Sequence, residues 1–205
     1  MPKSAALISF VLSFTFIAFA TSNNFQDTGG RISSKGSFLT LSGSTLSAVS
    51  LGGASRSGKL GTVSFTTGPL LSGSLGGGGT FAAGGSFQVT GNGANGLPAG
   101  VLFQGTFTGP VAWKAIWNPK GYPHGDWSYQ LSGSVGGTFA NGQRASINFV
   151  AVTFDVSGGG EFSSSVRLKD AMASAAAVPE PGTLALLGTG LFGLGMLGFR
   201  WRSAR

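Results

Sequence analysis

Short apolar runs separated by clusters of glycine fill the middle of this chain, and no other feature restricts the fold as narrowly. Of the 37 glycines, six lie between residues 182 and 198, and the other 31 lie between residues 29 and 160. From Phe38 onward the runs are rich in Val, Leu, Phe and Thr, a composition typical of strands joined by turns. No window before residue 178 has a helical period. We therefore predict an all-β domain over residues 38–170, preceded by a polar arm at 21–37.

Several of these runs place an apolar residue at every second position. In residues 127–135 the apolar positions alternate with Ser128, Gln130, Ser132 and Ser134. One apolar and one polar face predict antiparallel strands with a solvated side. We predict a single antiparallel β-sandwich, with a flattened β-barrel as the alternative. The apolar phase switches within residues 144–156, which predicts a β-bulge near Phe149 or a strand buried on both faces.

Two segments are similar to each other. Residues 71–81 and 131–139 share a Leu-Ser-Gly-Ser start, a glycine cluster and a Thr-Phe end. This similarity predicts two like hairpins, at 71–90 and 131–156. Asn141-Gly142 predicts a type I′ turn in the second, because both central residues of that turn need positive φ.

Composition excludes some classes of function. The chain of 205 residues has no cysteine, so thiolate metal sites and cysteine nucleophiles are excluded. The net charge of +7 comes from scattered basic residues, which form no run or stripe that could follow a phosphate backbone. We expect no nucleic-acid partner and no cofactor.

The N-terminal 20 residues have the features of a signal peptide. Lys3 supplies the positive start, residues 5–20 are apolar apart from a few hydroxyl residues, and Ala18-Phe19-Ala20 fits the small-x-small cleavage rule. We therefore expect export across the inner membrane, with residues 1–20 forming a signal helix.

The last 28 residues combine three signals. Pro179-Glu180-Pro181 favours extended backbone. Residues 182–199 carry no charge, and as a helix they would reach about 27 Å, enough to cross a bilayer core. Three arginines close the chain and predict a cytoplasmic end. We expect a transmembrane helix here, joined to the β domain by a small-residue linker at 171–177.

Together these three parts resemble the PEP-CTERM sorting tail of exported bacterial proteins, and the resemblance is confined to residues 178–205. It implies that Pro179, Glu180 and Pro181 are recognised by an exosortase, a membrane-embedded enzyme similar to cysteine transpeptidases. It also implies that the apolar helix holds the protein transiently in the inner membrane. The basic end, Arg200, Arg202 and Arg205, would stop translocation. The resemblance concerns sorting and leaves the role of the β domain open.

Candidate catalytic groups are few. His124 is the only histidine and is close in sequence to Asp126. A hydrolase could combine such groups with a serine, but no Gly-x-Ser-x-Gly elbow is present. One histidine among widely spaced acids also gives no zinc pattern. We therefore expect no catalytic residues, no metal site and no enzyme, and a secreted hydrolase is the least favoured hypothesis.

Aromatic residues around loop 118–126 are the best binding candidates, because flat rings stack on sugars. Trp113, Trp117, Trp127 and Tyr129 lie in phase with the apolar stripes, which favours core packing. Burial of all three tryptophans would remove a sugar-binding platform. The candidate ligand-binding residues are Tyr122, His124 and Asp126, in and beside the loop.

These observations favour an exported cell-surface or extracellular-matrix protein with a structural or interaction role. Its expected partners are an exosortase and the inner membrane, both transient, and extracellular polysaccharide. The alternative is a carbohydrate-binding module at the envelope or in exopolysaccharide.

Overall fold

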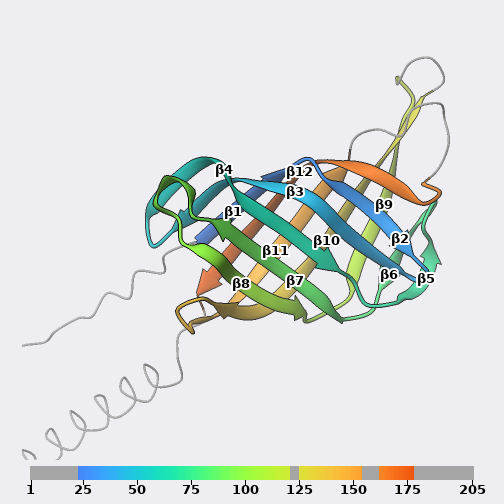
Figure 1. The fold of residues 1–205 in the computed structure, drawn as a ribbon. Helices are drawn as coiled ribbons and strands as arrows, with labels where there is room; N and C mark the ends of the chain where they lie inside the picture. The colour runs from blue at the N-terminus through green and yellow to red at the C-terminus, as the bar shows by residue number, and fades with distance from the viewer. Residues whose placement is uncertain (1–22, 121–124, 154–161, 178–205) are drawn as a thin grey trace, which may run out of the picture.

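Most of the described chain is strand. The computed structural model describes residues 23–120, 125–153 and 162–177, which form one twelve-stranded antiparallel sheet (Figure 1). The only other regular element among them is a short 3₁₀ turn, η1 (Ala94–Gly96). The prediction of an all-β antiparallel fold is confirmed.

The twelve strands follow one another along the chain with short connections. Their bounds are β1 (Asn23–Thr28), β2 (Arg31–Lys35), β3 (Phe38–Leu51), β4 (Ala54–Thr66), β5 (Leu70–Ser74), β6 (Gly78–Phe81), β7 (Gly84–Asn92), β8 (Ala99–Phe107), β9 (Val111–Asn118), β10 (Asp126–Phe139), β11 (Arg144–Thr153) and β12 (Ser165–Ala177).

The hydrogen-bonded pairing closes on itself. It runs from β1 through β3, β4, β7, β8, β10, β11 and β12, and β12 pairs again with β1. We call this closed order of strands the circuit. None of its strands has an open edge, so their backbone groups are hydrogen-bonded on both sides. In Figure 1 the strands β3, β4, β7 and β8 form a near layer that crosses the layer of β10 and β11 behind it.

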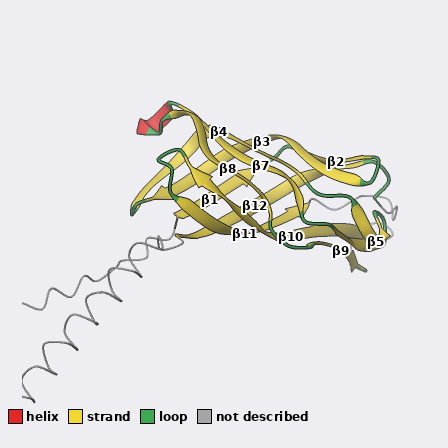
Figure 2. Ribbon diagram, turned by 90° about the horizontal axis from the view of Figure 1, so that it is seen from below, coloured by secondary structure: helices red, strands yellow, loops and turns green. Residues whose placement is uncertain are grey.

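Some consecutive strands are two halves of one bent strand. Both β1 and β2 lie between β3 and β12, and the bend between them is Gly29-Gly30, where both residues have positive φ. A Cβ on Gly30 would lie 2.6 Å from the Ser44 amide nitrogen, so only glycine fits there. Both β8 and β9 pair with β10 in the same way. The pairings β9–β6 and β6–β5 extend the sheet past the closed circuit at one end (Figure 2).

Aromatic side chains fill the interior. Phe65, Phe87 and Phe149 meet edge to face, with Phe87 and Phe149 ring centroids 5.1 Å apart and Phe65 and Phe149 5.4 Å apart. Phe103 and Phe139 pack in the same way at 5.2 Å. Phe65 and Phe87 come from the near layer and Phe149 from the layer behind it, whereas Phe103 and Phe139 are cross-strand neighbours on β8 and β10. Each ring buries a large apolar area in a favourable geometry. The closed sheet therefore encloses packed side chains.

The domain is longer at both ends than the sequence predicted. Residues 21–37 were expected to be a polar arm, but β1 and β2 occupy 23–35, and Phe25 and Ile32 are fully buried. Residues 171–177 were expected to be a linker, but they form the second half of β12. Both segments have a polar or small-residue composition, and the strands beside them in the sheet determine their conformation.

Three local predictions also need correction. In β11 the buried series Ala145, Ile147, Phe149 and Ala151 continues without a bulge at Phe149, and Val150 faces outward, 37% exposed. At the β10–β11 turn only Gly142 has positive φ, so the type I′ geometry is not adopted. The predicted hairpin at 131–156 is formed, over its described residues, by β10 and β11, but its predicted likeness to 71–90 is wrong. Residues 71–81 form the β5–β6 hairpin, whereas the similar residues 131–139 lie within the single strand β10.

We predict that Gly105→Ala destabilises the domain by about 2 kcal/mol, because overpacking against fixed backbone costs that order of free energy. An added Cβ would lie 2.4 Å from the Gly136 carbonyl oxygen on β10. Urea unfolding followed by tryptophan fluorescence measures the change. Gly109→Ala is the matched control, since nothing lies within 4 Å of its added Cβ. Equal stability of the two variants would contradict the close approach of β8 and β10.

Candidate ligand-binding site

The β9–β10 hairpin projects from one end of the closed sheet (Figure 1). Among the described residues, β9 beyond Trp113 and β10 before Gln130 make backbone pairs only with each other. The two strands pair residue for residue, and Trp117 lies directly opposite Trp127. The side chains on the inward-facing side of the hairpin therefore begin in the core at its base and extend past the core at its tip.

The base of this inward-facing series is core. Trp113 and Tyr129 are 1% and 0% exposed, and their rings stack with centroids 4.9 Å apart and planes 9° apart. Trp113 Nε1 donates to the Leu75 carbonyl at 2.8 Å, and the Tyr129 hydroxyl donates to the Gly76 carbonyl at 2.9 Å. Each polar tip therefore has a partner, as a buried tryptophan or tyrosine requires. The core role expected for these two residues is confirmed.

The tip of the same series is not core. Trp117 is 42% exposed, and Trp127 is only partly buried against the core cluster. Their ring centroids are 5.1 Å apart and their planes are tilted by 51°. The apolar phase could not separate Trp117 from Trp113, because exposure here depends on where the neighbouring strands end. Burial of Trp113, Trp117 and Trp127 would have excluded a sugar-binding platform, but only Trp113 is fully buried.

The end of the hairpin lies close against the Trp117 ring. A Cβ on Gly125 would lie 2.3 Å from Cζ2 of Trp117, and Gly125 has a φ of 84°. Glycine is thus required at this position both for its conformation and for its contact with the indole. Of the three predicted ligand-binding residues, Asp126 begins β10 opposite Asn118, while Tyr122 and His124 lie outside the described residues. Within the described chain Asp126 Oδ1 has no hydrogen-bond partner.

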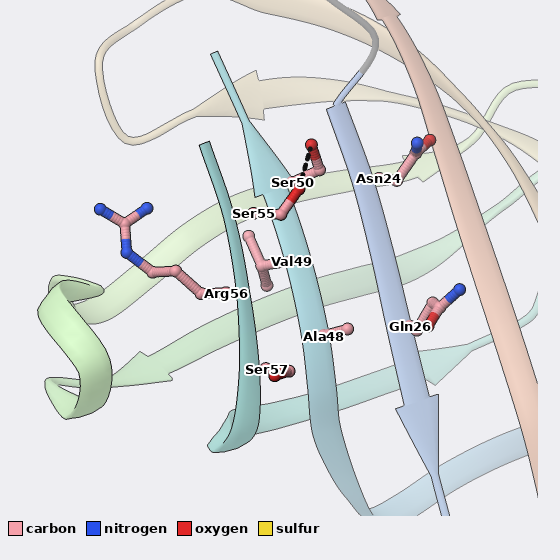
Figure 3. Close-up of a pocket in the computed structure, with 8 residues that line it drawn as sticks. All are labelled: Asn24, Gln26, Ala48, Val49, Ser50, Ser55, Arg56 and Ser57. Atoms are coloured by element: carbon pink, nitrogen blue, oxygen red, sulfur yellow. Dashed lines mark hydrogen bonds between the residues drawn. The ribbon is translucent and has the colours of Figure 1, made fainter. Parts of the chain in front are cut away.

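Apart from the hairpin, a hollow lies on the outer face of β1, β3 and β4 (Figure 3). It is an open groove of about 310 Å³, with side chains of Asn24, Gln26, Ser50, Ser55 and Ser57 along it. In Figure 3 the Arg56 side chain extends away from these groups, and its Nε donates to the Asn95 carbonyl at 3.0 Å. The groove therefore offers neutral hydroxyl and amide groups.

One buried carboxyl group was missed by the sequence reasoning. Asp27 is 1% exposed, lies between β3 and β12, and accepts a hydrogen bond from the Ser44 hydroxyl. The pKa of Asp27 is raised from its ordinary value of 3.8 to about 6, mainly by burial; the Ser44 hydrogen bond partly offsets this rise and the nearby Asp170 charge adds to it. No signal for it was present in the sequence, because the phase that Asp27 shares with Phe25 has a meaning only once residues 23–28 are known to be a strand.

The other predicted site residues cannot be placed. Pro179, Glu180, Pro181, Arg200, Arg202 and Arg205 lie outside the described residues, as do the expected signal and transmembrane helices. Across residues 23–120, 125–153 and 162–177, no helix is long and apolar enough to cross a membrane. The same residues contain no cluster of three or more metal-ligating side chains.

Comparison with known proteins gives no relative. No protein-family profile, no curated protein and no solved structure matches the chain.

We predict that Asp27 makes the stability of the domain fall as pH rises from about 4 to about 6. The unfolded carboxyl ionises near 3.8 and the folded one near 6, so the unfolded state releases its proton first in this interval. The difference corresponds to roughly 3 kcal/mol of unfolding free energy by the linkage relation. Urea unfolding of the wild type and of Asp27→Asn at pH 4, 5, 6 and 7 measures it.

Asp27→Asn should largely remove this slope, because the amide does not ionise. The exposed Asp170 supplies the control: Asp170→Asn should keep most of the slope while lowering the pKa of Asp27 slightly. A wild type whose stability is constant or rises over this interval would contradict the prediction.

Proposed function

We propose that this chain is an exported cell-surface or extracellular-matrix protein with a structural or interaction role, released from the inner membrane by an exosortase. The observation that carries the proposal is the three-part tail at 178–205, with Pro179, Glu180 and Pro181 as the sorting motif. In this proposal residues 1–20 are a signal helix that is removed on export. Residues 182–199 form the transient membrane anchor, and the final arginines lie on its cytoplasmic side.

The position of the chain ends is consistent with this route. β12 ends at Ala177, so the motif follows two residues later with no linker between. Asn23 at the start of β1 pairs with Ala175 of β12, so the chain enters and leaves the domain at the same end. An anchor there would hold the folded domain close to the membrane, and the β9–β10 hairpin would face away from it (Figure 1).

The surface chemistry favours an interaction role in a polymer. No charged residue occurs between Lys59 and Lys114, a stretch that includes all of β5, β6, β7 and β8. Neutral polar residues pair across β4, β7 and β8: Thr62 with Thr90, Ser64 with Gln88, and Gln88 with Gln104. Hydroxyl and amide groups exchange hydrogen bonds with the hydroxyls of a polysaccharide without a charge to desolvate. The alternative of a carbohydrate-binding module is favoured by the exposed Trp117–Trp127 pair.

We predict that Glu180→Ala leaves the protein in the membrane fraction, because the variant lacks the carboxylate of the sorting motif. The measurement is an immunoblot of membrane and medium fractions from a bacterial host that has an exosortase. Thr183→Ala, two residues past the motif in the apolar run, is the control and should be released normally. Normal release of Glu180→Ala, or equal release in a host without an exosortase, would overturn the proposal.

A further inference from the structure

One aromatic contact in the described structure is open to solvent. Among the ring contacts within the described residues, only that between Trp117 and Trp127 includes a ring more than one third exposed. The other rings in such contacts are buried in the core cluster. Leaving a large indole in water forfeits its burial free energy, so this pair is a candidate contact surface.

We propose that Trp117 and Trp127 form a stacking platform for a neutral polysaccharide at the tip of the β9–β10 hairpin. The location of this partner outside the cell rests on the function proposed above, whereas the binding itself is a property of the hairpin. The sugar ring presents its C–H face to the indoles, and its hydroxyls remain at the rim in water.

The charge pattern selects a neutral ligand. The inward-facing series of the hairpin consists of Val111, Trp113, Ala115 and Trp117 on β9 and Trp127, Tyr129 and Leu131 on β10. None of these residues is charged. Lys114 and Asp126 lie in the alternate phase, which places them on the other face of the hairpin. Recognition on the tryptophan face therefore depends on stacking, and salt should affect it little.

The size of the platform also selects the ligand class. A stable protein interface buries about 800 Å² on each partner. The exposed aromatic surface here consists of two indoles, and the residue between Trp117 and Trp113 on the same face is the small Ala115. Two rings are too small for a protein partner of that kind, but they match the width of one or two sugar rings.

The platform is held in place before any ligand arrives. Trp127 packs against the core, Trp117 contacts Trp127, and the backbone at Gly125 closes against the Trp117 ring. A fixed ring loses little conformational entropy on binding, which favours affinity. The hairpin also lies at the end of the domain opposite the start of β1 and the end of β12 (Figure 1), so an anchored domain would present it outward.

Affinity gel electrophoresis tests the proposal with the full chain in a detergent that has no sugar headgroup. The gels contain hydroxyethyl cellulose, laminarin or alginate. We expect at least one of the two neutral polymers to retard the wild type, with little change on adding salt. Retardation by the anionic alginate reports the net charge of +7 and should fall as salt is added. Trp117→Ala should weaken this binding about tenfold, the loss of one aromatic contact.

Two variants separate binding from folding. Ile116→Ala removes a side chain of similar exposure, 38%, on the opposite face of β9, and it should bind as the wild type does. Trp117→Tyr keeps a flat ring and should restore most of the binding lost in Trp117→Ala. No retardation by either neutral polymer, retardation by alginate that persists in salt and is lost in Trp117→Ala, or equal binding of the neutral polymers by Trp117→Ala would overturn the proposal. None of these results depends on exosortase processing. A failure to bind would therefore not count against the sorting proposal, which the Glu180→Ala variant tests.

Discussion

The fold depends on the pairing of the first strand of the domain with the last. β1 lies between β3 and β12, and without it the circuit of strands would have two open edges beside an exposed core. The hydrogen bond from Ser174 Oγ to Asn24 Oδ1 joins residues 150 positions apart. Such distant contacts carry a large loop-closure cost and slow folding, so the sheet is expected to complete its core only when the chain is nearly whole.

Closure also determines where a ligand can bind. Phe65 of β4 and Phe149 of β11 meet across the interior. Two hollows are open grooves on the outer faces, and a third, which Leu102 and Phe139 line, lies at an end of the strand circuit. The described surface therefore offers contact with other molecules at its outer faces, at this end and at the hairpin that extends past the circuit. The outer faces offer hydroxyl and amide groups, and the hairpin adds aromatic rings. The proposed contacts with a polysaccharide use both kinds of surface.

The alternation of apolar and polar residues was enough to predict an antiparallel all-β domain. It also predicted the burial of Trp113 and Tyr129, because a residue's phase determines its face. Phase does not determine how far a neighbouring strand extends, and so it could not distinguish Trp117 from Trp113. The polar segment that became β1 gave no strand signal, since its conformation is determined by partners far away in sequence. The similar segments at 71–81 and 131–139 diverge for the same reason.

The strand nearest the proposed anchor has a mechanical consequence. β12 is hydrogen-bonded on both edges, to β11 on one side and to β1 and β2 on the other. A tether attached beyond Ala177 would pull along the axis of this strand. That direction loads the hydrogen bonds of both ladders in shear, all at once, whereas a pull across the strand would unzip them one by one. In the proposed arrangement, with the tail as an anchor, the domain would therefore resist tension along β12.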